Sequence, residues 1–307
     1  MDTLFIPLSF VAGSLLAVQA GANAQLAKAT GSPFTATTLQ LIVGTVLLAV
    51  LALVTGTLTA LATLPQIVWW HAIGGTASAF YVVSTILLFP RLGAVVSVGL
   101  IIAGQMFASL VLDTSGWLGV PARGLGFSTL AGTLGVLLGA AAVVFGQPGG
   151  PAATRPGPGW ILLALAAGAV LPVQGAVNAL LRQDLGAPLA VAAVSFLVAT
   201  ITMAGLSGLL LALRRQPPAS PPPGLAAMPW WGWLGGFAGA TYVTTLFTAI
   251  PVIGSATAVG LTVAGQQLAS VLVDRHGWFR LAQRTVSGLR LAGVGLIITG
   301  VAVLKLA

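Results

Sequence analysis

Two pairs of amide side chains recur in the chain with the same spacing. Gln19 and Asn23 are four residues apart, and Gln174 and Asn178 repeat the pair at an offset of 155 residues. Residues four apart share one face of a helix, and amides offer hydrogen-bond donors and acceptors inside a membrane without burying a charge. We expect the four side chains to converge between two repeats and bind a polar solute. In the alternative, they only join neighbouring helices by hydrogen bonds.

The two tyrosines of the chain, Tyr81 and Tyr242, also occupy equivalent positions, here at an offset of 161 residues. A ring that carries a hydroxyl could line or gate a solute pathway. It could equally be a packed side chain whose hydroxyl bonds to a neighbouring helix. We expect the pair to lie along the same route as the amides.

Gln105 and Gln266 form a further equivalent pair, each within the tripeptide Ala-Gly-Gln. The patterns Gly99-x-x-x-Ala103 and Gly260-x-x-x-Ala264 precede them, and such spacing of small residues lets two helices approach closely. We therefore favour packing across the boundary between the repeats for these glutamines, with a place in the pathway as the alternative.

Two of the four acids, Asp113 and Asp274, stand at equivalent positions in the motif Asp-x-x-Gly-Trp. Each could be a proton or cation site. Each could equally form an ion pair at the membrane interface, with Arg123 and Arg275 as candidate partners. Charged groups at span ends are common in membrane proteins, so we favour the ion pair.

Several kinds of chemistry have no support in the sequence. The chain has no cysteine, and His71 and His276 do not recur as a pair, so we expect no metal site and no cofactor. No phosphate-binding loop, catalytic triad or haem motif is present, which argues against an enzyme and against ATP-driven transport. No acid falls at the centre of a predicted span, which disfavours a proton-coupled antiporter of cationic drugs.

The composition explains where these polar residues must be placed. The 307-residue chain is 57% hydrophobic and only 5% charged, whereas soluble domains carry about 25% charged residues. Most side chains must therefore face lipid or other apolar helices. The net charge of +8 results from twelve Lys and Arg against four acids, and the basic residues are scattered between apolar runs, which indicates loop charges rather than a nucleic-acid partner.

The apolar runs divide into ten predicted transmembrane helices of about 20 residues each. The first begins so near the N-terminus, without preceding basic residues, that it reads as a retained helix rather than a signal peptide. The tryptophans all lie near predicted span ends, as in an aromatic belt. The predicted spans are 4–22, 35–56, 67–89, 93–112, 124–145, 160–181, 188–213, 229–250, 254–273 and 287–306.

The second half of the chain repeats the first. Residues 74–117 and 235–278 are identical at 19 of 44 positions. We assign a first five-helix repeat to 1–146, a linker to 147–159 and a second repeat to 160–307. Because five is odd, the second copy enters the membrane from the opposite side. The predicted fold is an all-α membrane protein of ten transmembrane helices, built as two inverted five-helix repeats.

The repeated motifs Val-Gln-x-x-x-Asn and Ala-Gly-Gln-x-x-Ala-Ser-x-x-x-Asp-x-x-Gly-Trp resemble the YdcZ-like branch of the drug/metabolite transporter superfamily, and the resemblance covers essentially the whole chain. That branch includes five-helix proteins that pair antiparallel and fused two-domain forms, and this chain looks like a fused form. The resemblance implies an exporter of the bacterial inner membrane.

Together these patterns favour a secondary transporter that moves a small neutral or zwitterionic solute by alternating access. A membrane scaffold and a lipid-headgroup flippase are the alternatives. The expected partners are the solute and membrane lipid, with the chain as a monomer or homodimer. Nine of the twelve Lys and Arg fall on one side of the predicted topology, so the positive-inside rule places both termini outside the cytoplasm.

Overall fold

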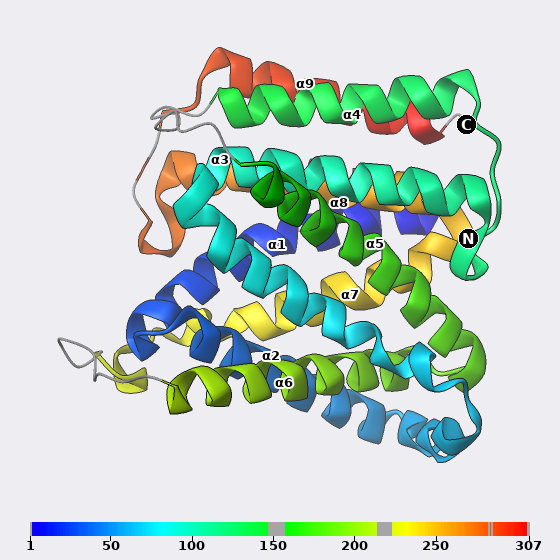
Figure 1. Cartoon of the computed structure of the whole chain (residues 1–307), viewed down its shortest axis with the longest axis vertical. Helices are drawn as coiled ribbons and strands as arrows, with labels where there is room; N and C mark the ends of the chain where they lie inside the picture. The colour runs from blue at the N-terminus through cyan, green and yellow to red at the C-terminus, as the bar shows by residue number, and fades with distance from the viewer. Residues whose placement is uncertain (1, 147–156, 214–222, 282, 284, 306–307) are drawn as a thin grey trace.

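The computed structural model describes residues 2–146, 157–213, 223–281, 283 and 285–305, and every regular element in that part of the chain is helical (Figure 1). Most of the linker 147–159 and of the Pro-rich loop Arg214–Gly224 lies outside the described residues. The long helices are α1 Asp2–Thr30, α2 Pro33–Val54, α3 Thr76–Ser115, α4 Phe127–Phe145, α5 Pro158–Leu185, α6 Pro188–Ala212, α7 Leu234–Ile253, α8 Ser255–His276 and α9 Gly288–Lys305. Short 3₁₀ helices are η1 Thr57–Gln66, η2 Trp69–Gly75, η3 Trp117–Gly119, η4 Leu225–Ala227, η5 Trp230–Trp233 and η6 Trp278–Arg280.

Local sequence explains where several helices begin. Proline stands at the first turn of α2 and of α6, at Pro33 and Pro188, where its missing N–H would have no partner anyway. Ser32 caps α2 by accepting a hydrogen bond from the backbone N–H of Thr35 at 3.3 Å. The two starts are equivalent positions of the repeat.

The membrane prediction is confirmed at the level of an all-helical, multi-span protein. Within the described residues, nine stretches are long and apolar enough to cross a membrane, and α9 provides a shorter apolar stretch, Gly288–Leu304. Figure 1 places the start of α1 and the end of α9 on the same side of the bundle. An even number of crossings would give this placement, but the division into ten spans stays a prediction.

One predicted helix boundary is wrong. We expected the chain to leave the helix at Pro90-Arg91, between the third and fourth spans, but α3 runs unbroken from Thr76 to Ser115. A proline inside a helix removes one backbone hydrogen bond and bends the axis, yet its φ remains helical. Figure 1 shows α3 as two arms that meet at an angle, and one helix thus supplies the candidate spans Trp69–Leu88 and Ser97–Ser115.

Helices from opposite halves pack against each other in antiparallel pairs. Between α2 and α6, Thr38 bonds to Ser207 and Thr45 bonds to Thr200, both at 2.9 Å. Residue numbers therefore rise along α2 as they fall along α6. Thr45 and Thr200 are themselves equivalent positions at the 155-residue offset, so their contact lies where the two halves meet symmetrically.

Glycines make the same arrangement between α4 and α9. A methyl group on Gly132 would lie 2.7 Å from the carbonyl oxygen of Gly300, and one on Gly139 would lie 2.6 Å from that of Gly293. Gly132 and Gly293 are equivalent positions, as are Gly139 and Gly300. The two backbones can approach this closely only because neither helix carries a side chain at the crossing points.

Very close crossings also join the first helix of each half to the other half. Gly13 of α1 and Gly265 of α8 each lie so close to the opposite backbone that a Cβ would overlap a carbonyl oxygen. Gly168 of α5 and Gly104 of α3 make the equivalent crossing. The small-residue patterns beginning at Gly99 and Gly260 instead face α4 and α9 at ordinary or slightly short distances.

These crossings give the first testable prediction. Replacing Gly168 by Ala places a methyl group against the carbonyl oxygen of Ile101, and overpacking of this kind costs about 1–3 kcal/mol. We expect a clearly lower apparent melting temperature for purified Gly168→Ala in detergent. Gly205 of α6 has nothing within 4 Å of its Cβ position, so Gly205→Ala is the matched control and should melt at or slightly above the parent temperature. Equal melting of both variants would contradict the crossing.

Candidate functional site

A polar contact between the halves lies where α5 passes the first arm of α3. Gln174 of α5 is buried, and its amide both accepts from and donates to the hydroxyl of Ser78, at 3.0 and 2.9 Å. The hydroxyl donates its proton to the amide oxygen and accepts from the amide nitrogen on a lone pair, so one hydroxyl group engages both ends of the amide. Gln174 is therefore held in place across the boundary between the halves.

Asn178, one turn further along α5, is fully buried and bonds within its own half. Its Nδ2 donates to the hydroxyl of Ser195 on α6 at 3.0 Å. Its Oδ1 lies against Gly74 and has no hydrogen-bond partner. A buried amide oxygen without a donor is costly, so this atom is a strong candidate to receive a hydrogen bond from a ligand or a water molecule.

The amides of α1 make the mirrored set of contacts with different chemistry. Gln19 lies against Gly239 of α7, the position equivalent to Ser78, so it meets no hydroxyl there. Asn23 donates to the hydroxyl of Thr37 on α2 at 3.4 Å, and its Oδ1 is buried without a partner. In each half the glutamine thus reaches across to the other half, and the asparagine bonds within its own.

The two tyrosines lie near each other but pack against different groups of apolar residues. The side chains of Tyr81 and Tyr242 are close enough to interact electrostatically, and Thr262 of α8 is within hydrogen-bonding reach of Tyr242. Tyr242 also lines a small cavity of about 10 Å³ with Gln174 and Asn178. That volume is about what one water molecule requires.

The predicted convergence of four amides is therefore seen only in part. The structure brings Gln174, Asn178 and Tyr242 to one cavity, which Tyr81 does not line. No hydrogen bond among the described residues joins the α1 amides to the α5 amides. Whether any of these side chains binds a solute stays a prediction.

Sequence reasoning missed three members of this polar layer: Ser78, Ser195 and Gln40. Gln40 of α2 is buried against Gly235, and its Oε1 has no hydrogen-bond partner. Gln40 and Ser195 are equivalent positions, but they differ in residue type, so a search for identical repeated residues passed over them. A search for polar residues at equivalent positions would have found the pair.

Gln105 and Gln266 lie beside the tight crossings rather than in the cavity. Gln105 is buried and Gln266 is partly buried. The neighbouring glycines, Gly104 and Gly265, make the close backbone contacts with α5 and α1. This placement fits packing between the halves.

The two acids of the repeated motif have different partners, and Arg123 lies close enough to Asp113 to act on its charge. Asp113 accepts hydrogen bonds from the backbone N–H groups of Ser255 and Ala256, and Asp274 accepts from Arg290 Nη2 at 2.7 Å. Arg290 is completely buried near the start of α9. In the described part of the chain, no group of three or more His, Asp or Glu could hold a metal ion.

With this arrangement in view, comparison with known proteins identifies the family. The family described as "Putative inner membrane exporter, YdcZ" matches residues 4–142 and 159–303. The chain belongs to this family. It is thus a multi-pass protein of an inner-membrane transporter family, a class distinct from enzymes.

The other comparisons add the fold alone. No curated protein matches this YdcZ-family chain. A solved crystal structure aligns over 98% of this chain and 95% of its own, with a TM-score of 0.68 and 20% sequence identity. At that identity the likeness shows a shared fold and carries no information about the solute.

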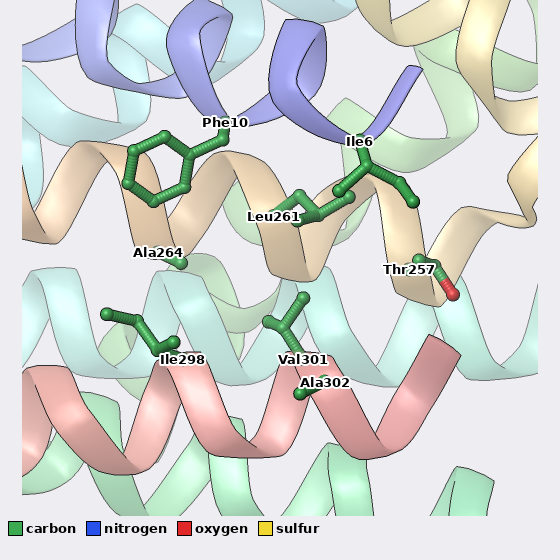
Figure 2. A pocket seen from close by; sticks show the side chains of 8 residues that line it. All are labelled: Ile6, Phe10, Thr257, Leu261, Ala264, Ile298, Val301 and Ala302. Atoms are coloured by element: carbon green, nitrogen blue, oxygen red, sulfur yellow. The ribbon is translucent and has the colours of Figure 1, made fainter. Parts of the chain in front are cut away.

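The YdcZ-family chain also has an apolar pocket away from the amides. The pocket has a volume of about 230 Å³ and lies between α1, α8 and α9. Figure 2 shows Phe10 and Ile6 of α1 pointing toward Leu261 of α8, above Ile298 and Val301 of α9. Thr257 is the one polar side chain of the lining, so a polar solute would lose most of its hydrogen bonds there.

The contact between Ser78 and Gln174 gives a second prediction. Replacing Ser78 by Ala removes the hydroxyl that serves both ends of the Gln174 amide. Leaving a buried amide unsatisfied costs about 1–3 kcal/mol, so Ser78→Ala should lower the apparent melting temperature of the purified protein. Thr299→Ala is the control, because that hydroxyl is exposed and bonds only to its own helix. If Ser78→Ala has the same melting temperature as the parent protein, the contact between Ser78 and Gln174 does not stabilise the fold.

Proposed function

We propose that this protein is a secondary transporter that binds a small neutral or zwitterionic solute between its two halves and exposes it to the two sides of the membrane in turn. One observation carries the proposal: neutral polar side chains are buried where the halves meet, and the Asn23 and Asn178 oxygens among them lack donors. The family's description as exporters favours outward movement.

The unpartnered oxygens favour a solute that donates hydrogen bonds. Thr37 already uses its hydroxyl proton on the carbonyl oxygen of Pro33, at 2.8 Å. It can therefore only accept from Asn23, which turns the Asn23 Oδ1 away from it. An amide, amine or hydroxyl of a solute could supply the missing donor, whereas an anion would face oxygens that repel it.

The proposed alternation uses the two halves as rocking units. The ten-span division would place residues 1–146 in one unit and 160–307 in the other, with the solute site at their junction near the bilayer midplane. The antiparallel packing of α2 with α6 and of α4 with α9 supports this division into two units. Both termini are then proposed to face outward, as the Lys and Arg count predicts.

A lipid-headgroup flippase is the second candidate, and the apolar pocket between α1, α8 and α9 is the observation that favours it. An acyl chain could occupy such a pocket while a headgroup moves along a polar route. Flux assays separate the candidates, because a flippase acts on labelled lipid whereas a solute transporter acts on a water-soluble compound. A scaffold would move neither.

The solute can be sought before any flux is measured. A compound that binds the folded protein raises its melting temperature by mass action. We would screen the purified protein against neutral amides, amino acids, sugars, nucleosides and small amines. Donor-rich compounds should raise the melting temperature, and simple carboxylates of the same size should not.

The third prediction concerns flux of the solute found in that screen. Each amide hydrogen bond contributes about 0.5–1.5 kcal/mol, and 1.4 kcal/mol corresponds to a factor of ten in affinity. In proteoliposomes the double variant Asn23→Ala, Asn178→Ala should therefore lose about tenfold or more of its uptake at low solute concentration. Gln183→Ala, at an exposed position near the end of α5, is the control and should retain uptake.

The variants must be compared as folded proteins of equal amount in the vesicles. Full uptake by the folded double variant would contradict the proposed site. If the double variant fails to fold and the parent protein shows no uptake, the results would instead support the scaffold.

A further inference from the structure

The junction between α7 and α8 is a one-residue break held by the other half of the protein. Gly254 has φ +85° and ψ 157°, a conformation that residues with a Cβ rarely adopt. The break leaves the first N–H groups of α8 without partners inside the helix. Asp113, at the end of α3, accepts from two of them, Ser255 N–H at 2.6 Å and Ala256 N–H at 2.7 Å.

A guanidinium completes this contact. Arg123 lies against Gly254 and donates to the carbonyl oxygen of Val252 at 3.1 Å. The Asp113 carboxylate is only 4% exposed, and a carboxylate at a helix N-terminus is favoured by both charge and hydrogen bonding. The end of α3 and the break before α8 are thereby joined across the two halves.

The equivalent place in the first half has a different structure. Residues 93–95 are the counterparts of residues 254–256 at the 161-residue offset. They lie within the unbroken helix α3 and so present no helix N-terminus. Asp274, the counterpart of Asp113, bonds to Arg290 instead.

The segments that carry the two acids do not explain this difference, because they have the same backbone shape. Gly116 and Gly277 end their helices with φ of +68° and +65°. Leu118 and Phe279, two residues later, have φ of +54° and +58°. Both acids are therefore presented alike, and only their partners differ.

Arg290 is the partner that one half has and the other lacks. Its counterpart in the first half is Thr129. Arg290 is buried, and its Nε and Nη1 have no hydrogen-bond partner, so Asp274 is the one acid that compensates its charge in the described structure. Arg290 thus competes with any helix N-terminus for the Asp274 carboxylate.

We propose that Asp113 and Asp274 are alternating gate residues, an inference that rests on the proposed transport function. In the conformation described, Asp113 caps α8 and closes one end of the junction, while Arg290 holds Asp274. In the opposite conformation the halves exchange roles. The chain breaks at Gly93, Asp274 caps the new helix N-terminus at residues 94 and 95, and Asp113 leaves α8, whose end then opens to water.

The absence of cysteine from the chain makes a direct test possible. Ala256 is 2% exposed beneath the Asp113 cap. A cysteine in Ala256→Cys should therefore react slowly with a membrane-impermeant maleimide that is added on the membrane face nearer residue 256. Adding Asp113→Asn should raise the labelling rate about fivefold or more, because two charge-assisted hydrogen bonds to α8 are weakened. Asp184→Asn is the matched control, since Asp184 pairs with His71 at a different site, and it should leave the rate unchanged.

A second pair of variants separates a gate from a merely structural role. Arg290→Thr gives the second half the residue of the first and frees Asp274 to cap residues 94 and 95, so labelling of Ala256→Cys should rise. Adding Asp274→Asn to Arg290→Thr removes that cap and should return labelling to the parent rate. If Arg290→Thr raised labelling only by damaging the structure, adding Asp274→Asn would not bring the labelling rate back down.

Three results would overturn the proposal. Asp113→Asn could leave the labelling rate unchanged, or Arg290→Thr with Asp274→Asn could label like Arg290→Thr alone. In the third, Asp113→Asn would also expose a cysteine at Ala140, buried in the α4–α9 contact, which would indicate general unfolding. Because labelling needs no solute, a protein with this labelling pattern but no flux would refute transport and keep the switch. A protein that transports solute but lacks this labelling pattern would refute the switch and keep the transport function.

Discussion

The structure depends on close backbone contact between helices of opposite halves. Inside a bilayer, apolar side chains gain little by leaving lipid for protein, so helices associate where small residues let their backbones approach. Gly13 with Gly265, and Gly104 with Gly168, mark the two equivalent crossings of this kind. These crossings bring the end of α1 beside α7 and the end of α5 beside the first arm of α3. The buried amides and tyrosines occupy that region.

The halves share much of their backbone design, apart from the break at Gly254 that α3 lacks, but not all of its chemistry. Gln174 meets a hydroxyl at Ser78, whereas Gln19 meets a glycine at the equivalent position. Asp113 caps a helix, whereas Asp274 pairs with a buried arginine. Such differences are compatible with the proposed alternation, in which the two inverted halves would be in different states at any one time. The differences include polar positions at the boundary between the halves.

Much of the fold was predictable because hydropathy and tryptophan placement are strong signals over 20-residue runs, and the family was predictable from motifs that occur twice. Three features were not. Pro90 suggested a break, but a bent helix tolerates a proline at the loss of one hydrogen bond. The patterns from Gly99 and Gly260 suggested the tight seams, but Gly104 and Gly265 form them, because helix rotation decides which glycine faces a partner. The partner of Asp113 is backbone, which leaves no trace in residue types.

The proposed transport requires the junction near Gln174, Asn178 and Tyr242 to open to each side of the membrane in turn. Val243 lines the same cavity and is close to cysteine in size, so Val243→Cys in sealed vesicles of known orientation tests the claim directly with impermeant thiol reagents. We expect this cysteine to react from either face, and reaction from one face to block later reaction from the other. A cysteine that reacts from neither face, in protein shown to be folded, would contradict it.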